Sequence, residues 1–248
     1  MLIDQPKVFV GTMYCGESEF EECCDSINSQ IGVKINHIII KNKNEYDAHN
    51  LLWKEWSDSK KDYDIFIKID ADTIILRKTA FLEILDLFSN KKVTGVQILL
   101  HDYFTDSLIP GLNSFSNKVV FKKSKKRLFA DHSDSNHEKV LKGKCVEHLA
   151  PIGLHCKKPH DRQSFHYGLH RKLKGQEEVL KKCAVAWLKK RDNARAWALA
   201  GALSSNIFLK RNFDYGNKMF ERNFNKFFPI SSSLDKIEKY ALKLIRNG

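Results

Sequence analysis

Two carboxylates stand one residue apart in the segment Asp64–Leu76, DIFIKIDADTIIL, where Asp70 and Asp72 follow one apolar run and precede another. In an extended backbone, residues i and i+2 project to the same side. Mg²⁺ and Mn²⁺ prefer oxygen ligands and commonly take only one or two protein carboxylates. The pair therefore predicts a site for a divalent cation that stabilises charge on phosphate oxygens. Acidic pairs also occur as solvated turn residues or helix caps, so their position in the fold matters.

The elements around this pair alternate between strand and helix patterns. Apolar, β-branched runs indicate strands at residues 7–10, 33–40, 65–70 and 93–99, and periodic segments indicate amphipathic helices at 17–29, 46–56 and 80–88. This alternation predicts an α/β fold with a mainly parallel central sheet that helices cover on both faces. Ligands of such sheets bind just beyond the carboxyl ends of the strands, where Asp70 and Asp72 are expected.

The remaining sequence has less regular patterns until it becomes helical. For residues 103–148 we expect a loop around Pro110 and Gly111, a strand over KVVF (118–121) and a helix over SNHEKVL (135–141). Beyond residue 175 the chain reads as helix, with one amphipathic pattern over 176–203 and a last helix over 233–246.

The formal net charge of +12 is unevenly distributed. Residues 1–150 contain 21 basic and 22 acidic side chains, whereas residues 151–248 contain 21 and 8. Such an asymmetry indicates an anionic partner for the last part of the chain, such as a diphosphate, an acidic lipid surface or nucleic acid. A solvated helical face is the alternative interpretation.

The cysteines and the apolar runs indicate the cellular compartment in which we expect the protein. None of the six cysteines belongs to a CxxC pair, so we expect reduced thiols, several of them as small core residues. No run approaches the roughly 18 apolar residues that span a bilayer. The first residues, MLIDQPKVFV, lack a basic region before an apolar stretch. We expect a cytoplasmic protein, with peripheral attachment to the inner membrane face as a further option.

Three stretches together resemble the GT-A glycosyltransferases, especially the family-two inverting enzymes, across about residues 7–170. They are VFVGTMYCGESEFEECCDSINSQ, with Ser26 and Gln30 near its end, AHNLLW at the start of a helix, and IKIDADT with the DxD pair. The resemblance implies a GT-A fold with a catalytic domain at 1–174 and a basic, mainly helical extension at 175–248. It also implies metal-dependent transfer of a sugar from a nucleotide-diphosphate sugar to an acceptor hydroxyl.

The resemblance also implies which residues act. It implies a donor site formed by Thr12, Tyr14, Glu17, His49, Asn50, Asp70 and Asp72. The implied cofactor is Mn²⁺ or Mg²⁺, held by Asp70, Asp72 and His155, because many GT-A enzymes bring a late histidine to the metal. His166 is the next candidate for that histidine. A glycan or a lipid-linked acceptor is the expected second substrate.

The sequence departs from the family pattern at two places. Where the family has an aspartate that reads the base, this chain has Asn42 or Asn44, so the nucleotide stays open. The family's Glu-Asp base motif is missing in its usual form. We expect Asp134 as the base, at the start of a helix whose dipole keeps it ionised, with Asp131 as the runner-up. Plain helix capping is the alternative role.

Other classes of protein remain open. A nucleotide-sugar hydrolase or a nucleotidyltransferase on a similar fold would share strand-end carboxylates, although the chain has neither GxGxxG nor a P-loop lysine motif. A nucleic-acid-binding protein could use the mixed aromatic and basic segment KRNFDYGNKMFERNFNKFF at 210–228. We expect no nucleic-acid partner, because helices that pack apolar faces on a core give the same periodicity.

Overall fold

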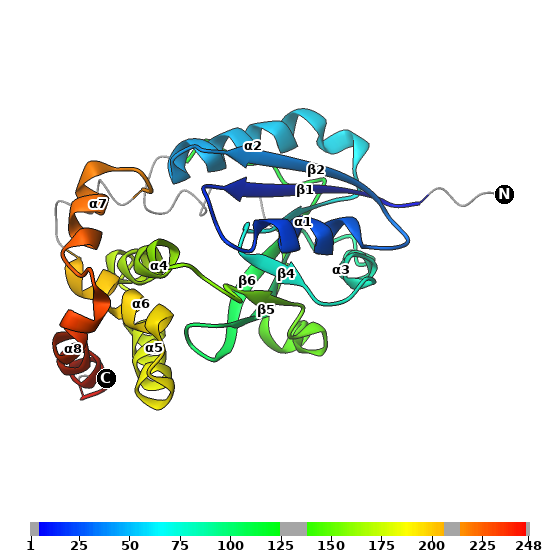
Figure 1. Ribbon diagram of the computed structural model, residues 1–248. Helices are drawn as coiled ribbons and strands as arrows, with labels where there is room; N and C mark the ends of the chain where they lie inside the picture. The colour runs from blue at the N-terminus through cyan, green and yellow to red at the C-terminus, as the bar shows by residue number, and fades with distance from the viewer. Residues whose placement is uncertain (1–4, 125–137, 206–213, 247–248) are drawn as a thin grey trace. The chain divides into compact units, whose positions relative to one another are not determined.

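The computed structural model describes residues 5–124, 138–205 and 214–246. The chain divides into two compact units. Unit 1 comprises Met1–Asp102 and Leu108–Lys157 and holds the sheet, and unit 2 comprises Tyr103–Ser107 and Lys158–Gly248 and is helical (Figure 1). The expected division into a catalytic domain and an extension at residue 174 concerns function and stays a prediction.

Unit 1 is built on one mixed sheet with the strand order β2-β1-β3-β6-β5-β8-β4, and β7 pairs with β5 outside this path. The strands are β1 (Lys7–Tyr14), β2 (Lys34–Lys41), β3 (Ile65–Lys68), β4 (Thr73–Ile75), β5 (Gly95–Asp102), β6 (Ser107–Ser116), β7 (Val140–Leu141) and β8 (Gly153–His155). β1 pairs in parallel with β2 and β3, and β5 in parallel with β7 and β8. β6 runs antiparallel to β3, and β4 runs antiparallel to β8.

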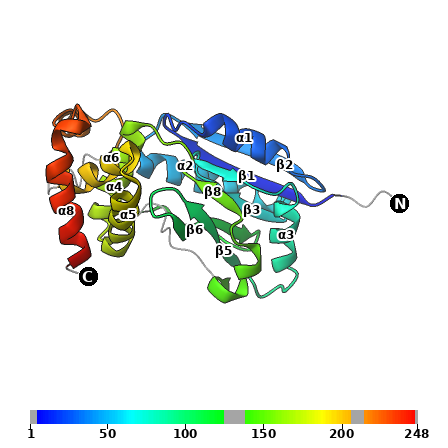
Figure 2. The same ribbon diagram turned by 60° about the horizontal axis from the view of Figure 1, so that its bottom comes forward.

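Three helices of unit 1 cover both faces of this sheet: α1 (Phe20–Asn28), α2 (Glu45–Ser59) and α3 (Ala80–Leu87). Successive strand residues point to opposite faces, so Val8 and Val10 pack with α1 and α3, while Phe9 packs with α2. Figures 1 and 2 show α1 and α2 on either side of β1. The expected α/β class, with a central sheet flanked by helices, is confirmed.

Short 3₁₀ turns complete unit 1: η1 (Lys60–Asp62), η3 (Gly143–Cys145) and η4 (Glu147–Leu149). The expected loop around Pro110 is wrong, because this segment is strand β6. Pro110 lies beyond the part of β6 that pairs with β3, so its missing N–H costs no bond in that ladder.

Two further expectations for the middle of the chain are wrong. In KVVF, Lys118 belongs to a turn, Val119 and Val120 have no regular structure, and only Phe121 forms a bridge. The expected helix over SNHEKVL is also wrong at its described end, since Val140 and Leu141 form strand β7 beside β5. In β7, pairing with a distant strand outweighs the local helical pattern.

Unit 2 contains α4 (Asp161–Leu173), α5 (Glu177–Lys190), α6 (Asn193–Ser204), α7 (Lys218–Asn225), the 3₁₀ turn η6 (Ile230–Ser233) and α8 (Leu234–Arg246). The expected last helix is confirmed as α8. The single pattern over 176–203 divides into α5 and α6, because Arg191 takes a left-handed φ of 52° and Asp192 caps α6. α4 and α6 pack closely at Gly168 and Gly201, where an added Cβ would meet backbone atoms of the other helix.

Two other expectations can be compared with the structure. None of the six cysteines, all of which lie in the described residues, forms a disulfide, and Cys23, Cys156 and Cys183 are buried, as expected for reduced thiols in a core. Within residues 5–124, 138–205 and 214–246, no helix combines the length and the apolar character that crossing a bilayer requires.

Candidate metal centre

The parallel strands β1, β2 and β3 end at the same edge of the sheet. Their register places Tyr14 beside Lys41 and Gly11 beside Lys68. The N–H of Ile69 donates to the carbonyl of Gly11 at 3.0 Å, so Asp70 follows directly at this edge. This is the carboxyl edge, where ligands of α/β sheets bind.

Strand β8 brings His155 to Asp72. His155 pairs with the first residue of β4, and the N–H of Cys156 donates to the carbonyl of Asp72 at 2.8 Å. Gly153 permits this approach, because a Cβ there would lie 2.8 Å from the carbonyl oxygen of Ile74. Since strand side chains alternate, a slip of one residue would turn His155 to the other face of the sheet.

Three atoms of different chemistry gather at this point: Asp72 Oδ2, His155 Nε2 and Cys156 Sγ. Asp72 Oδ2 lies 3.7 Å from His155 Nε2 and 3.1 Å from Cys156 Sγ, and the last two atoms are 3.7 Å apart. The other oxygen, Asp72 Oδ1, is buried and has no hydrogen-bond partner within the described part of the chain. An orphaned carboxylate oxygen is costly unless a cation or water satisfies it, so these residues fit a divalent ion.

Asp102 orients the histidine of this cluster. It is the last residue of β5, is fully buried, and pairs with His155 in the β5–β8 ladder. Asp102 Oδ1 lies 2.7 Å from His155 Nδ1. A carboxylate accepts a hydrogen bond from Nδ1–H, which leaves the lone pair of Nε2 for a metal ion beside Asp72.

Asp70 is held by a buried lysine. Lys68 Nζ donates to Asp70 Oδ1 at 2.6 Å, and the lysine side chain is only 8% exposed while that of Asp70 is 44% exposed. Burial acts to raise the pKa of Asp70, but the charge and hydrogen bond of Lys68 outweigh it, with help from His49 and His155, so the pKa is lowered. Asp70 is therefore ionised and presents its carboxylate at the sheet edge.

Glu17 adds a third carboxylate to the same region. It accepts a hydrogen bond from the N–H of Cys15 at 2.7 Å. Burial raises the pKa of Glu17 to about 7, with further contributions from the charges of Asp72 and Asp70 against the opposing effect of the Cys15 N–H. The charges of Asp70 and Asp72 therefore create a negative potential at Glu17, which a bound cation would relieve.

Thr12 and Tyr14, two of the expected donor residues, lie on β1. Thr12 is fully buried, and its Oγ1 is 2.9 Å from His37 Nε2. The ring of Tyr14 stacks on Phe20 with centroids 4.0 Å apart, so Tyr14 is part of an aromatic pair at the carboxyl edge.

His49 and Asn50, the other two, lie in α2. His49 is buried with Nδ1 2.9 Å from the carbonyl oxygen of Glu45, and its charge acts on Asp70. Asn50 donates to the carbonyl of Tyr46 at 3.0 Å and accepts the N–H of Ser124 at 2.8 Å. Both residues therefore also hold their own part of the chain together.

Some expected site residues lie elsewhere. Asp131 and Asp134 fall outside the described residues. His166 belongs to α4 in unit 2, where its ring stacks on Tyr215 with centroids 4.4 Å apart. The cluster around Asp72 uses His155 instead, the first choice among the late histidines.

Sequence reasoning missed three acidic or thiol groups of this region. Asp102 follows an apolar strand just as Asp70 does, so the same signal could have found it. Cys156 directly follows His155, but the expectation of reduced thiols for the six cysteines gives it no role in the site. Glu19 is 2% exposed, and its charge acts on Cys156, although nothing in its local sequence marks it.

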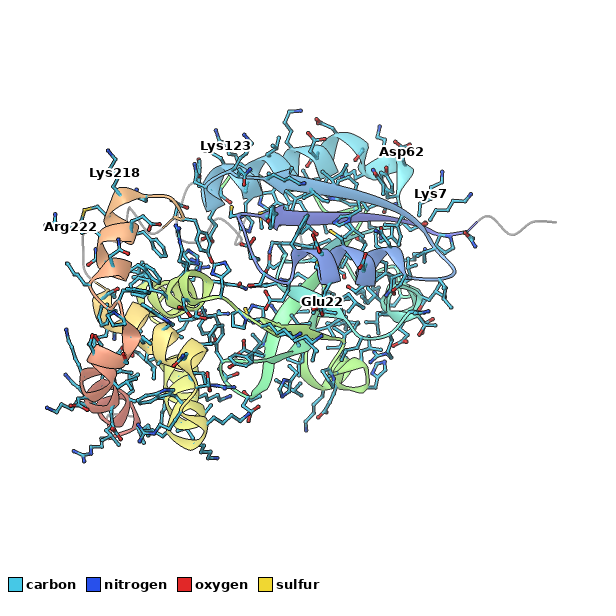
Figure 3. All side chains as sticks on the ribbon, in the orientation of Figure 1. Lys7, Glu22, Asp62, Lys123, Lys218 and Arg222 are labelled. Carbon is cyan, nitrogen blue, oxygen red and sulfur yellow. The ribbon has the colours of Figure 1, made fainter. Side chains whose placement is uncertain are left out.

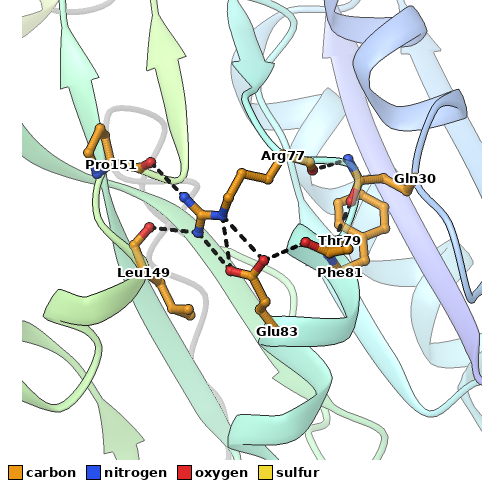
Figure 4. A network of polar contacts seen from close by, with 7 residues as sticks. All are labelled: Gln30, Arg77, Thr79, Phe81, Glu83, Leu149 and Pro151. Atoms are coloured by element: carbon orange, nitrogen blue, oxygen red, sulfur yellow. Dashed lines mark hydrogen bonds and ion pairs between the residues drawn. The ribbon is translucent and has the colours of Figure 1, made fainter.

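The motif residues Ser26 and Gln30 hold the strand that follows the DxD pair. Ser26 Oγ accepts the N–H of Ile75 at 3.0 Å. Gln30 donates to the carbonyl of Arg77 at 2.8 Å and accepts the N–H of Phe81 at 3.1 Å (Figure 4). These bonds fix α1 against β4 and the start of α3, so the two motif residues position the site rather than contact a ligand.

Two ion pairs support the same region. Arg77 binds the carboxylate of Glu83 and donates to the carbonyls of Leu149 and Pro151 (Figure 4). Glu22 of α1, labelled in Figure 3, accepts from Lys157 Nζ at 2.8 Å. The second pair anchors the chain directly after Cys156 to α1.

A cavity of about 580 Å³ lies at the opposite edge of the sheet. Its lining includes Lys7 and Ile65, which begin β1 and β3. Because parallel strands share their direction, this cavity is at the amino edge, away from Asp70 and Asp72.

No protein-family model matches the chain, and no curated protein sequence matches it. Solved structures that are similar to parts or most of it include the following three. The mannosyltransferase PcManGT from Pyrobaculum calidifontis, in complex with GDP-Man and Mn²⁺, is 10% identical with a TM-score of 0.43, covering 97% of this chain and 86% of that one. A197 from STIV is 13% identical with a TM-score of 0.36, covering 45% of this chain and 65% of that one.

The third structure is a glycosyltransferase involved in the glycosylation of the major capsid of PBCV-1. It is 11% identical with a TM-score of 0.32, covering 46% of this chain and 61% of that one. The present chain thus spans less than two thirds of A197 and of the PBCV-1 enzyme. Likenesses of this size do not assign a function, so the function of this chain must be inferred from the residues of its site.

Proposed function

We propose that this chain is a metal-dependent glycosyltransferase of GT-A type that takes its sugar from a nucleotide-diphosphate sugar. The observation that carries the proposal is the Asp72 carboxylate at the carboxyl edge of the sheet. Its Oδ2 lies 3.7 Å from Nε2 of the oriented His155, and its buried Oδ1 has no hydrogen-bond partner among the described residues. The ordered motifs of the sequence, from the turn at Tyr14 to the DxD pair, lead to the same edge. The orphaned carboxylate oxygen and the DxD pair both favour a divalent cation there.

In this proposal Asp72 and His155 hold Mn²⁺ or Mg²⁺, and Asp70 lies beside them as a further ligand or as a partner of a metal-bound water. The ion, when bound, would stabilise charge on the diphosphate leaving group. Lys68 keeps Asp70 ionised and oriented through its 2.6 Å hydrogen bond. Thr12, Tyr14, Glu17, His49 and Asn50 would line the donor site around this centre.

In the proposed reaction, a carboxylate base activates the acceptor hydroxyl, and the transfer inverts the configuration at the anomeric carbon. Asp134, with Asp131 as the alternative, would take the proton of the acceptor hydroxyl as that oxygen attacks the anomeric carbon. A positioned base of this kind contributes roughly 10²–10⁴-fold. Asp134→Asn should therefore abolish transfer and leave donor binding intact, and full turnover in that variant would remove Asp134 from the mechanism.

Donor binding tests the central proposal directly. We would screen UDP-, GDP-, CMP- and dTDP-sugars by thermal shift, with and without Mn²⁺, since a ligand of the native state raises apparent stability. One donor should raise the melting temperature only when Mn²⁺ is present. Asp72→Asn should abolish that shift, whereas Asp58→Asn, on the exposed surface of α2, should keep it. A metal-dependent shift that survives in Asp72→Asn would refute the proposal.

Hydrolysis of the donor is the alternative chemistry for the same site. It predicts that free sugar appears at an undiminished rate without any acceptor, whereas a transferase needs the acceptor. Nucleic-acid binding has less support, because Phe220, Phe224 and Phe227 of the aromatic, basic segment are buried. Buried rings do not serve as stacking platforms for bases.

A lipid-linked acceptor would bring the protein to a membrane surface on the cytoplasmic side. Unit 2 offers Phe228, which is 67% exposed, near the exposed lysines Lys226 and Lys236. Such a combination suits peripheral contact with anionic lipids. Flotation with phosphatidylserine vesicles at low and moderate salt tests this, and no binding at either salt would end the idea.

A further inference from the structure

We propose that the metal centre also binds zinc. The Cys156 thiolate would then be the third protein ligand of the ion, together with Asp72 and His155. Zinc would then occupy the centre in competition with Mn²⁺ or Mg²⁺. The inference rests on the metal site of the proposed function, but it does not depend on sugar transfer.

The distances among the three ligand atoms carry this inference. Zinc binds sulfur at about 2.3 Å and nitrogen or oxygen at about 2.0–2.1 Å, in a tetrahedral arrangement. Those bonds place the nitrogen and the oxygen about 3.3 Å apart and the sulfur about 3.6 Å from each. The observed separations of 3.7, 3.7 and 3.1 Å differ from these values by no more than about 0.5 Å.

The backbone places the thiol at the site. Cys156 has a left-handed φ of 55°, which few non-glycine residues adopt, and its side chain is buried. Its N–H is also fixed on the carbonyl of Asp72 by the 2.8 Å hydrogen bond. Sulfur and carboxylate are therefore held together by main-chain structure, not by a flexible side chain alone.

Without an ion, a proton takes the place of the metal between sulfur and carboxylate. The Cys156 thiol donates to Asp72 Oδ2 at 3.1 Å. Zinc binding would break the S–H bond, form a Zn–S bond and release the proton to solvent. Burial and the charges of Asp72, Asp102 and Glu19 disfavour an isolated thiolate at Cys156, and a bound divalent cation would offset these charges.

The nature of the ligands gives the expected selectivity. Thiolate sulfur is a soft ligand that suits zinc, whereas Mn²⁺ and Mg²⁺ prefer carboxylate, carbonyl and water oxygens. Three protein ligands also leave one tetrahedral position open, as in zinc sites where water or a substrate binds. Cys156 should therefore strengthen the binding of zinc and contribute little to that of manganese.

Metal titrations of the full chain, without any nucleotide-sugar, test the inference. We would measure Zn²⁺ and Mn²⁺ affinities by isothermal titration calorimetry for the wild type, Cys156→Ser and the control Cys145→Ser, whose cysteine is exposed. Cys156→Ser should weaken zinc binding by at least about tenfold and change manganese binding by less than about threefold. Cys145→Ser should match the wild type for both ions.

Cobalt substitution gives a readout that does not depend on a variant. Co²⁺ added to the wild-type chain should give the near-ultraviolet charge-transfer band of a cobalt–thiolate bond, and Cys145→Ser should keep it. The inference would be overturned if the wild type lacked this band, or if a folded Cys156→Ser protein bound zinc as tightly as the wild type. Manganese binding by the wild type would in that case still support the metal site of the proposed function. If neither zinc nor manganese binds the wild type, the metal site of the proposed function fails as well.

Discussion

Replacing Asp102 with Asn should weaken metal binding without touching a ligand. The Asp102 carboxylate is fully buried and accepts the hydrogen bond of His155 Nδ1–H at 2.7 Å. Asn has nearly the same shape, but its amide is neutral and carries donors as well as an acceptor. The variant therefore keeps the packing at the end of β5 and loses the charge that fixes the tautomer of His155.

The size of the effect follows from this one bond. A hydrogen bond to a charged group contributes about 1.5–3 kcal/mol, because the ionised acceptor strengthens it. If all of that energy orients His155 for the metal, the Mn²⁺ affinity should fall by roughly 10- to 150-fold at 1.4 kcal/mol per factor of ten. Outer-shell carboxylates of metal-binding histidines typically account for 10–100-fold, which agrees with this range.

Two measurements separate positioning from general damage. Mn²⁺ affinity would be followed by titration calorimetry, and the protonated nitrogen of His155 by ¹⁵N NMR of the ring. In the wild type the proton should be on Nδ1, and Asp102→Asn should populate the Nε2–H form. Asp106→Asn is a matched control, since Asp106 is 46% exposed and pairs with Lys190 in unit 2.

A folded Asp102→Asn protein that binds Mn²⁺ as tightly as the wild type would refute the reasoning. So would an unchanged Nδ1–H tautomer in the variant, because the hydrogen bond to the carboxylate would then not be what selects it. If Asp102 had only a structural role, Asp102→Asn would lower the unfolding free energy and leave the tautomer of His155 unchanged.

Further predictions concern stability. The pKa of Glu17 is raised from 4.5 to about 7 in the folded protein. Between these two pH values the folded metal-free protein therefore holds a proton on Glu17 that the unfolded chain has lost. Its unfolding free energy should fall by about 3 kcal/mol as the pH rises from 4.5 to 7. Glu17→Gln should flatten that fall in urea unfolding with chelator, and an unchanged slope would contradict this. Gly201→Ala would place a Cβ 1.9 Å from the Phe165 carbonyl oxygen, so it should lower the unfolding free energy, measured with urea, by at least about 1–3 kcal/mol. The control Lys182→Ala, at an exposed residue, should change it by no more than about 0.5 kcal/mol. Equal stability of the two variants would refute the close helix contact. Arg195→Ala removes the guanidinium, 2% exposed, that binds Asp192 and two backbone carbonyls, so a loss of about 3–5 kcal/mol is expected in the same assay, and a loss under 1 kcal/mol would contradict it.

The sequence predicts most elements of the fold but misses strand β6. The strands β1, β2, β3 and β5 and the helices α1, α2 and α3 lie within a few residues of their expected positions, because each buries an apolar face with its own period. The last helix is predicted for the same reason. Strand β6 was missed, because Pro110 and Gly111 resemble a loop and its partner β3 lies about 50 residues earlier.

The candidate site shows the same division. The apolar strand alone places Asp70 and Asp72 at the carboxyl edge, and the family resemblance adds His155 and the donor residues, whose roles stay predictions. Asp102 and Cys156 entered only with the structure, and the base candidates Asp131 and Asp134 lie outside its described residues.

By itself, then, the sequence determined the strands β1, β2, β3 and β5, the helices α1, α2, α3 and α8, and the two carboxylates that follow β3, since these features depend on neighbours along the chain. Only the tertiary structure decided that Asp72, Asp102, His155 and Cys156 meet. Cys156 and Asp72 are 84 residues apart, and His155 and Asp102 are 53 apart. The registers of β8 against β4 and β5 bring them together, and strand pairing over such separations leaves no periodic signal in the local sequence.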